Sequence, residues 1–329
     1  MTKLMIYGAA GYTGRMASTN AKAHGLDFVI AGRAKDEGRL APIARDLGVE
    51  YRLFAADDRT ATEAALADVG VLLNCAGPFM HTAEPLMRAC IATGTHYLDI
   101  AAEMDSYRLA EALDAEAKAA GVMLLPGSGG SVAMLGSLAG HAAKRVTAPT
   151  KLSIAMQIAG GFSRGSAVSA SENVTTETLH RVDGTLVSRS PEDVRPFDFG
   201  KGPATSFPVT LPDLITIWRA TQIPNIETFV HVSEGAFPEG DLAAMPDGPT
   251  LEQREANRYY AAVEVTGEDG TVVRSVLDTV NGYTFTTIAA AEAARRVVGG
   301  EQRPGFQTPA MLFGDGFAET IADTMIEDL

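Results

Sequence analysis

The chain has 329 residues, 46% apolar and 21% charged, which is enough to bury one or two substantial cores. Its net charge of −14 argues against a general nucleic-acid binder or a protein that docks on anionic membranes, because both need clustered Lys and Arg. Two cysteines and six scattered histidines predict neither a disulfide framework nor a metal site. With no apolar run of about 18 residues and no leader-like start, we expect a cytoplasmic protein without a membrane span.

Short apolar runs alternate with helical stretches over the first 130 residues. Strands that alternate with helices form βαβ units, and right-handed crossovers then place helices on both faces of a parallel sheet. This half therefore predicts a Rossmann-type, doubly wound α/β domain. Its predicted strands are Leu4–Tyr7, Phe28–Ala31, Tyr51–Phe54, Val69–Leu73, His96–Ile100 and Val122–Leu125.

The pattern changes after about residue 147, where strand-like runs follow one another more closely. Two of them, 259–266 and 271–277, flank Gly267-Glu268-Asp269-Gly270, which is typical of a hairpin turn. We therefore expect a second, α+β domain with a mainly antiparallel sheet. Its other predicted elements are strands over 152–158 and 226–232, helices over 165–180, 284–298 and 309–326, and a long loop over 233–255.

The strongest local motif is GAAGYTGR, residues 8–15, which follows the first strand and opens a helix. Gly8 permits the tight turn, Gly11 lets the backbone approach a pyrophosphate, and Gly14 allows close packing of helix on sheet. The helix N-terminus offers free amides to the phosphates, and the hydroxyl of Thr13 could add a donor. Because the motif lies in the first βαβ unit, it predicts a dinucleotide site rather than a structural turn.

The second strand ends in Ala31-Gly32-Arg33, about 20 residues after the glycines, where the ribose-reading residue is expected. An arginine there suits the 2′-phosphate of NADP, whereas NAD sites usually carry an acid. Arg15 could add a second positive contact. Asp36 lies nearby, so NAD stays open as an alternative cofactor, as does the reading of Arg33 as a solvated surface residue.

The ends of the third and fourth strands supply further candidates for cofactor contact. Asp57 or Asp58 could bind the adenine amino group, or Asp58 could cap the next helix. Small residues in 74–79, NCAGPF, let the backbone lie against the cofactor. The residues that we expect to bind the dinucleotide are Gly8, Ala10, Gly11, Tyr12, Thr13, Gly14, Arg15, Arg33, Asp57, Asn74, Ala76, Gly77 and Pro78.

Chemistry is expected beyond the carboxyl ends of the fifth and sixth strands, which should face the nicotinamide. A carbonyl or imine reduction needs a proton donor as well as a hydride. The catalytic candidates are Tyr97, Asp99, Glu103 and Ser128. Helix capping is the alternative role for Asp99 and Glu103.

A second wall of this site is predicted from GGFSRGS, residues 160–166, which follows a strand. Ser163 or Ser166 could cap the next helix, and we expect Ser163 to lie at the substrate. Arg164 could hold a substrate carboxylate, or could be a solvated loop residue.

Several segments in this order resemble the saccharopine dehydrogenase-like family of NAD(P)-binding oxidoreductases, which includes bacterial trans-acting enoyl reductases. The resemblance implies a Rossmann domain followed by a domain with an antiparallel sheet, and a C-terminal helix that returns to the first domain. We accordingly expect residues 1–128 plus a helix within 305–329 to form the dinucleotide-binding domain, and 129–304 to serve substrate binding and dimerisation. The matching segments are GAAGYTGR (8–15), AGR (31–33), NCAGPF (74–79), YLDIAAE (97–103), GGFSRGS (160–166) and GFQTPAMLFGDGF (305–317).

Two functions from different classes are consistent with these motifs. The first is an NADP-dependent oxidoreductase that acts on a small carbonyl, imine or enoyl substrate, and it predicts a cleft lined by 97–103, 128–131 and 160–166. The second is a non-catalytic NADP-binding sensor or accessory protein, since no strong acid–base constellation is evident. Homodimerisation through the open sheet of the second domain is a further expectation.

Overall fold

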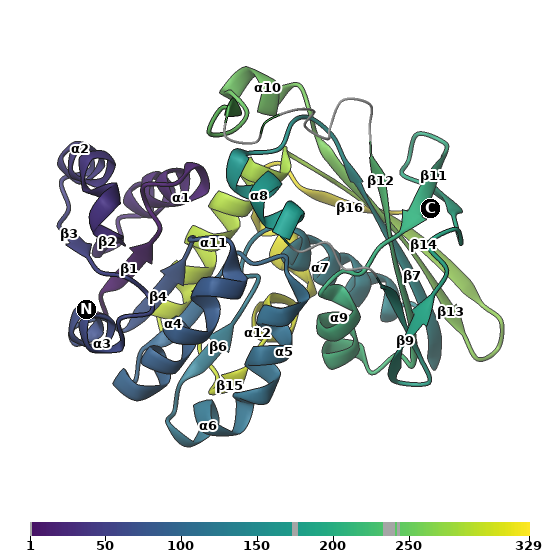
Figure 1. Cartoon of the computed structure of the whole chain (residues 1–329). Coiled ribbons are helices and arrows are strands. Elements are labelled where there is room, and N and C mark those ends of the chain that lie inside the picture. The colour runs from purple at the N-terminus through teal and green to yellow at the C-terminus, as the bar shows by residue number, and fades with distance from the viewer. Residues whose placement is uncertain (1, 173–176, 233–240, 242–243) are drawn as a thin grey trace.

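The computed structural model describes residues 2–172, 177–232, 241 and 244–329. Figure 1 shows two β-sheets side by side, with helices packed around the first sheet and between the two. Residues 233–240 and 242–243 of the predicted loop 233–255 lie outside the described residues; the last part of the loop holds a short helix, α10 (Leu251–Glu255). Among the helices of the described part, none is both long and apolar enough to cross a membrane.

The first sheet has seven parallel strands in the order β15-β6-β5-β4-β1-β2-β3. The strands β1, β2 and β4 are buried along their whole length, as expected when helices cover both faces. The order reverses between β1 and β4, which opens a crevice at their carboxyl ends. The bounds are β1 Leu4–Tyr7, β2 Phe28–Gly32, β3 Tyr51–Leu53, β4 Val71–Asn74, β5 His96–Asp99, β6 Met123–Leu125 and β15 Gly305–Phe306.

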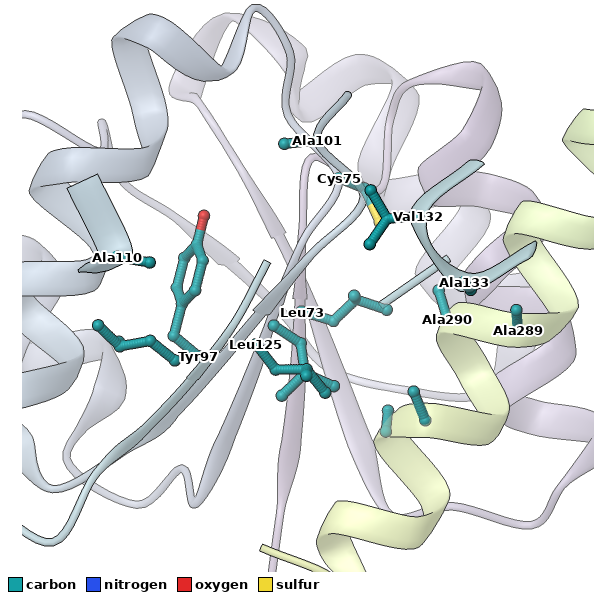
Figure 2. Packing of buried hydrophobic residues seen from close by; sticks show 14 of the residues in the cluster. Leu73, Cys75, Tyr97, Ala101, Ala110, Leu125, Val132, Ala133, Ala289 and Ala290 are labelled. Atoms are coloured by element: carbon teal, nitrogen blue, oxygen red, sulfur yellow. The ribbon is translucent and has the colours of Figure 1, made fainter. Parts of the chain in front are cut away.

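Helices from both halves of the chain cover this sheet. The helix α11 (Gly282–Val298) comes from the second half, yet it packs on α1 and β4, because a row of buried alanines permits close approach. Figure 2 shows two of them, Ala289 and Ala290, beside Ala133 of α7 (Ser131–Ala143). The other helices here are α1 Tyr12–Ala23, η1 Ala34–Asp36, α2 Glu37–Leu47, α3 Arg59–Leu66, α4 Phe79–Thr93, α5 Met104–Ala112 and α6 Asp114–Ala119.

The second sheet is mainly antiparallel, with a central path β10-β11-β12-β7-β13-β14-β16; β8 pairs with β12, and β9 pairs with β8. Only β7 and β12 run parallel, and the predicted hairpin at 267–270 joins β13 to β14. The strands are β7 Pro149–Ile158, β8 Thr178–Val182, β9 Thr185–Arg189, β10 Arg195–Asp198, β11 Pro203–Pro208, β12 Asn225–Val232, β13 Tyr259–Gly267, β14 Val272–Thr279 and β16 Met325–Asp328. This confirms the predicted α/β fold with a Rossmann sheet and a second, mainly antiparallel sheet.

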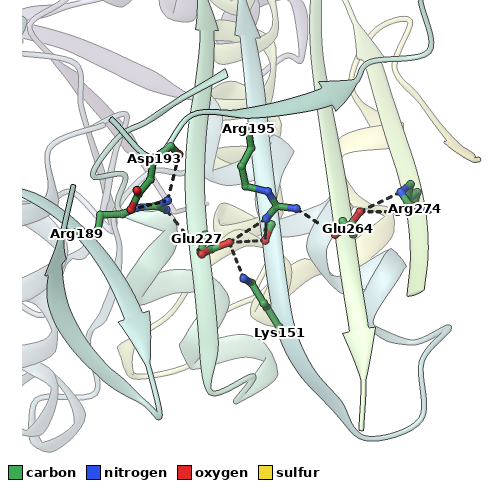
Figure 3. Close-up of polar contacts among 8 residues, drawn as sticks. Lys151, Arg189, Asp193, Arg195, Glu227, Glu264 and Arg274 are labelled. Atoms are coloured by element: carbon green, nitrogen blue, oxygen red, sulfur yellow. Dashed lines mark hydrogen bonds and ion pairs between the residues drawn. The ribbon is translucent and has the colours of Figure 1, made fainter. Parts of the chain in front are cut away.

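The two faces of the second sheet differ in chemistry. The helix α7 covers one face and packs on β7, β13 and β14 with apolar side chains. The strand β10 crosses the other face, where Arg195 binds Glu227 at 3.0 Å and Glu264 at 3.2 Å (Figure 3). The helices α8 (Arg164–Glu172) and α9 (Asp213–Thr221) flank the sheet on the side of the first domain.

Two expected helices differ from the structure. The helix predicted over 165–180 stops at Glu172, and residues 178–180 belong to β8 instead. The helix predicted over 309–326 is broken into α12 (Pro309–Phe313), the 3-10 helix η3 (Asp315–Thr320) and the strand β16. Gly314 causes the break, because its φ of +84° leaves the helical region.

The end of the chain consequently joins both sheets. The strand β15 extends the first sheet beside β6, and β16 pairs with β14 of the second. The helix α12, which the resemblance led us to expect against the first domain, packs on α7. The division of the chain at residues 128 and 129 stays a prediction.

Candidate functional site

The glycine loop after β1 has the geometry that its sequence predicts. Gly8 has a φ of +82° and donates its N–H to the carbonyl of Ala31 at 2.8 Å. Gly11 precedes α1 and donates to the carbonyl of Gly8 at 3.0 Å. Gly14 packs so closely on Gly8 that a Cβ there would overlap the carbonyl oxygen. The first turn of α1 therefore points unpaired amides toward the crevice.

A cavity of about 1140 Å³ lies over this loop and extends toward the second sheet. On the side of the first sheet it is bordered by the glycine loop, by Gly32 and Arg33, by 75–79, by 100–105 and by 129–131. On the other side it is bordered by 162–166 and by residues of β7, β8 and α11. A volume of this size exceeds the usual range for a drug-sized ligand and could hold a dinucleotide with a small substrate.

Nine of the thirteen expected cofactor residues border the cavity, all of them near the ends of β1, β2 and β4. Arg33 is among them, and its Nε donates to Asp36 Oδ2 at 2.9 Å. The residues are Gly8, Ala10, Gly11, Tyr12, Thr13, Arg33, Ala76, Gly77 and Pro78.

The other four expected residues lie outside the lining. Gly14 is buried in the packing of α1, and Arg15 lies 3.9 Å from Asp247 Oδ2. Asp57 is exposed, while its neighbour Asp58 caps α3 by accepting the amide of Ala61. Asn74 is fully buried.

Asn74 supports the cavity wall from beneath. Its Oδ1 accepts the amide of Ala76 at 2.9 Å, and its Nδ2 donates to Thr82 Oγ1 at 3.1 Å and Tyr97 Oη at 3.2 Å. These bonds fix the turn after β4, so Asn74 positions Ala76 rather than facing a ligand.

Three of the four catalytic candidates form a buried network under the cavity floor. The hydroxyl of Tyr97 donates to Asp99 Oδ2 at 2.9 Å, and Asp99 Oδ1 accepts the amides of Ala101 at 2.9 Å and Gly127 at 2.8 Å. Ser128 Oγ donates to the carbonyl of Asp99 at 2.7 Å. Tyr97, Asp99 and Ser128 are each fully buried, and none borders the cavity (Figure 2 shows Tyr97).

Asp99 therefore connects the loop after β5 to the loop after β6 by hydrogen bonds. Burial raises the pKa of its carboxyl to about 6, although the amide and hydroxyl donors act in the opposite direction. Of the four candidates only Glu103 borders the cavity, and its Oε2 accepts the amide of Ala102 at 3.0 Å.

The predicted second wall is present, with Ser163 and Arg164 on the cavity surface. Ser163 Oγ accepts the amide of Ser166 at 3.1 Å and so caps the start of α8, as its position predicted. The guanidinium of Arg164 binds Asp247 Oδ1 at 2.9 Å and the carbonyl of Met245 at 2.9 Å. This side chain is already engaged with protein groups.

Several lining residues were not predicted. Tyr283 accepts the amide of Ser163 at 2.6 Å and donates to Ser166 Oγ at 3.0 Å, and its ring meets that of Tyr12 edge-on. Arg39 also borders the cavity. It lies in the first turn of α2, shortly after Arg33, and this closeness in sequence could have identified it as a candidate for cofactor binding. Tyr259 and Tyr283 carry no local motif, since they reach the cavity only through folding of the second half.

Part of the cavity lining is apolar, although Glu177 and Thr210 border the cavity beside it. Methionine and aliphatic side chains from both halves of the chain converge there, together with one phenylalanine. We call this part the apolar chamber. Its members are Met104, Met134, Met156, Ile158, Phe162, Val168, Leu179, Val209 and Leu211.

In the part of the chain that the structure describes, no cluster of three or more His, Cys, Asp or Glu side chains could hold a metal ion.

Comparison with known proteins agrees with this geometry. Residues 4–125 match the family model of the saccharopine dehydrogenase NADP binding domain. The saccharopine dehydrogenase-like oxidoreductase of Rattus norvegicus is 28% identical over 124 residues, and the trans-acting enoyl reductase of Mycobacterium tuberculosis is 29% identical over 106 residues. Each match covers 31% of this chain, and they cover 28% and 25% of those relatives, so the chain matches under a third of the length of either.

A solved structure extends the likeness in fold to the whole chain. Apo saccharopine dehydrogenase (L-Glu forming) from Saccharomyces cerevisiae superposes with a TM-score of 0.68, covering 100% of both chains at 13% identity. At this identity the match shows the shared fold. Residues 4–125 are therefore similar in sequence to the NADP-binding domain of saccharopine dehydrogenases, and the whole chain shares the fold of saccharopine dehydrogenase.

Proposed function

We propose that this chain is an NADP-dependent oxidoreductase that transfers a hydride between the nicotinamide and a small carbonyl, imine or enoyl substrate. The observation that carries the proposal is the single cavity of about 1140 Å³, which joins the glycine loop to the apolar chamber. The bound nicotinamide would supply the hydride, and the protein supplies position and a site with little water.

The residues present fit the cofactor. The pyrophosphate is expected over the amides of Tyr12 and Thr13, at the N-terminus of α1. The 2′-phosphate is expected beside Arg33, at the end of β2. The loops at 101–103 and 129–131 would then flank the nicotinamide, next to the apolar chamber.

The lining of the chamber favours an uncharged substrate body. Its nine members carry no charge, and two arginines of the wider lining are already paired with carboxylates, Arg164 with Asp247 and Arg108 with Asp105. A buried carboxylate without such a partner is strongly disfavoured. For proton transfer, Glu103 is the candidate among the four that reaches the cavity, and Tyr283 offers a hydroxyl on the opposite wall.

One observation favours the alternative, a non-catalytic NADP-binding sensor or accessory protein. Tyr97, Asp99 and Ser128 are buried in structural hydrogen bonds, which leaves Glu103 as the one of the four catalytic candidates that borders the cavity. The size and apolar lining of the chamber favour the enzyme, because a sensor does not need a substrate-sized space beside the nicotinamide.

The test is a titration of the purified protein with NADPH and NADH, followed by nicotinamide fluorescence. Tight binding of NADPH, then NADPH oxidation with one of a panel of uncharged carbonyl, imine and enoyl compounds, is the expected result. Binding without turnover on any compound would favour the accessory protein, and absence of binding to either cofactor would overturn both functions.

The proposal includes a cytoplasmic location and a homodimer. Both cysteines are buried and unpaired, which fits a reducing compartment. The strand β16 is an edge of the second sheet and could pair with a second copy. Light scattering of the purified protein would give the mass that decides between monomer and dimer.

A further inference from the structure

A short segment, residues 244–250, crosses the cofactor side of the cavity; we call it the strap. The hydroxyl of Tyr12 donates to the carbonyl of Pro249 at 2.5 Å. A Cβ on Gly248 would lie 2.7 Å from the ring of Tyr12, so the strap backbone lies flat against this ring. The amide of Arg164 donates to the carbonyl of Asp247 at 3.2 Å, which holds the strap to α8 as well.

Asp247 is the charged residue of the strap, and its carboxylate meets three arginines from three helices. Arg39 of α2 lies at 2.8 Å and Arg164 of α8 at 2.9 Å. Arg15 of α1 lies at 3.9 Å. The carboxylate therefore links the two sides of the cavity through ion pairs.

Two of these arginines stand where the 2′-phosphate of NADP would be recognised. Arg15 directly follows the glycine loop, and Arg39 belongs to the helix that starts just after β2 and Arg33. The ribose of a dinucleotide is read at the end of this second strand. Arginines that converge on one point at this place form a typical phosphate site, because the guanidinium matches phosphate oxygens. Asp247 supplies an anion to that same point.

We propose that Asp247 is a specificity-determining residue that competes with the 2′-phosphate for Arg15 and Arg39. The inference rests on the proposed function, since it takes NADP as the cofactor. In the absence of cofactor the carboxylate neutralises both arginines. When a 2′-phosphate binds, these arginines exchange Asp247 for the phosphate, and the strap stays attached to α8 through Arg164. A cofactor without the 2′-phosphate makes no such exchange.

The exposure of these groups limits the size of the effect. The side chain of Asp247 is 38% exposed and that of Arg39 is 49% exposed, so water screens the ion pair. A pair of this kind contributes about 1 kcal/mol or less, which corresponds to a change in affinity of roughly fivefold. We therefore expect Asp247 to tune the preference for NADP and not to abolish it.

The test compares two nucleotides that differ in the 2′-phosphate, adenosine 2′,5′-bisphosphate and adenosine 5′-monophosphate. Their dissociation constants are measured by calorimetry on the full chain, on Asp247→Asn and on Glu255→Gln. The control removes one negative charge from an exposed position of the neighbouring α10. Asp247→Asn is expected to bind the bisphosphate roughly two- to fivefold more tightly and the monophosphate as before. The control is expected to change neither constant.

Equal affinities in Asp247→Asn and the unchanged protein would overturn the competition, as would weaker binding of the bisphosphate. The variant Arg39→Ala provides an independent check, because the effect of Asp247→Asn should shrink when its strongest partner on the first domain is absent. Melting curves of each variant show that it is folded. If the unchanged protein bound neither nucleotide, the NADP-dependent function would fall together with the inference. If the unchanged protein and Asp247→Asn preferred the bisphosphate by the same factor, the inference alone would fall.

Discussion

Gly8 at the end of β1 touches Ala76 at the end of β4: a Cβ on Gly8 would lie 2.8 Å from the backbone nitrogen of Ala76. The contact brings together the two loops that flank the reversal of strand order in the first sheet. Gly8 also has a φ of +82°, so both the space and the backbone conformation require glycine.

Replacement of Gly8 by alanine should therefore destabilise the protein and weaken cofactor binding. The left-handed backbone alone costs an L-residue about 1–2 kcal/mol, and displacement of Ala76 adds to this, so we expect a loss of at least ~2 kcal/mol. Gly38→Ala is the control, because Gly38 lies in α2 with open space around it. Alanine there should raise the free energy of unfolding by about 0.5–1 kcal/mol in urea titrations. Similar results for both variants would contradict the argument.

Arg33→Ala should lower the affinity for NADPH much more than that for NADH. A charge-assisted hydrogen bond to phosphate contributes about 1.5–3 kcal/mol, so NADPH binding should weaken roughly 10- to 100-fold. Binding of NADH, which lacks the 2′-phosphate, should change by less than about threefold. Arg59→Ala on α3 is the control, since its exposed side chain pairs only within that helix with Glu63. If Arg33→Ala lowered the affinities for NADPH and NADH by the same factor, Arg33 would not determine the preference between the two cofactors.

Asp213 should make the stability depend on pH. It is fully buried, neither of its carboxylate oxygens has a hydrogen-bond partner among the described residues, and burial raises its pKa to about 7. Below about pH 4 the carboxyl is protonated in both the folded and the unfolded chain. As the pH rises toward 7 the unfolded chain ionises first, so the stability contributed by this group is lost over that window.

The neutral variant Asp213→Asn should remove this loss. At about pH 8 its free energy of unfolding should exceed that of the unchanged protein by an amount on the order of 2–4 kcal/mol, and the difference should vanish near pH 4. Asp46→Asn, at an exposed position, should shift stability by less than ~0.5 kcal/mol at every pH. Urea titrations over this pH range would measure both, and a constant difference for Asp213→Asn would show that its carboxyl does not titrate in the window.

Both cysteines should resist alkylation in the folded protein. Burial raises the pKa of Cys75 to about 12, with a further contribution from the charge of Asp99, and burial likewise raises the pKa of Cys90. The thiolate is the reactive form, so iodoacetamide at about pH 8 should label neither residue until denaturant is added. Mass spectrometry of the labelled chain would measure this. Rapid labelling of Cys75 alone would indicate that the cavity it borders opens to solvent.

The Rossmann half was predicted well because its signals are local. Each strand from β1 to β6 is a short apolar run that ends at a turn, and the loop at 8–15 needs glycine for reasons confined to a few residues. The helix predicted over 309–326 was wrong. The apolar spacing of this segment fits a helix, but Gly314 and the pairing of β16 with β14 determine its structure. Pairing between strands that are distant in sequence leaves no local pattern.

The candidate site divides in the same way. Nine of the thirteen residues expected at the cofactor border the cavity, since they belong to loops next to strand ends, and their contact with a cofactor stays a prediction. Its catalytic side could not be predicted: Tyr97 and Asp99 stand at the expected strand end, but residues i and i+2 of a strand share one face, and on that face these two bond each other in the interior. Tyr283 reaches Ser163 across 120 positions of chain, which no spacing argument anticipates.

By itself the sequence determined the α/β class, the glycine loop and the arginine after β2, because each depends on the conformation of a few adjacent residues. Only the tertiary structure decided which polar groups are buried and which face the cavity, how the apolar chamber is assembled, and that Asp247 lies on Arg15 and Arg39. Burial and charge pairing are properties of residues that packing brings together from distant parts of the chain, and their energies exist only once both sheets are in place.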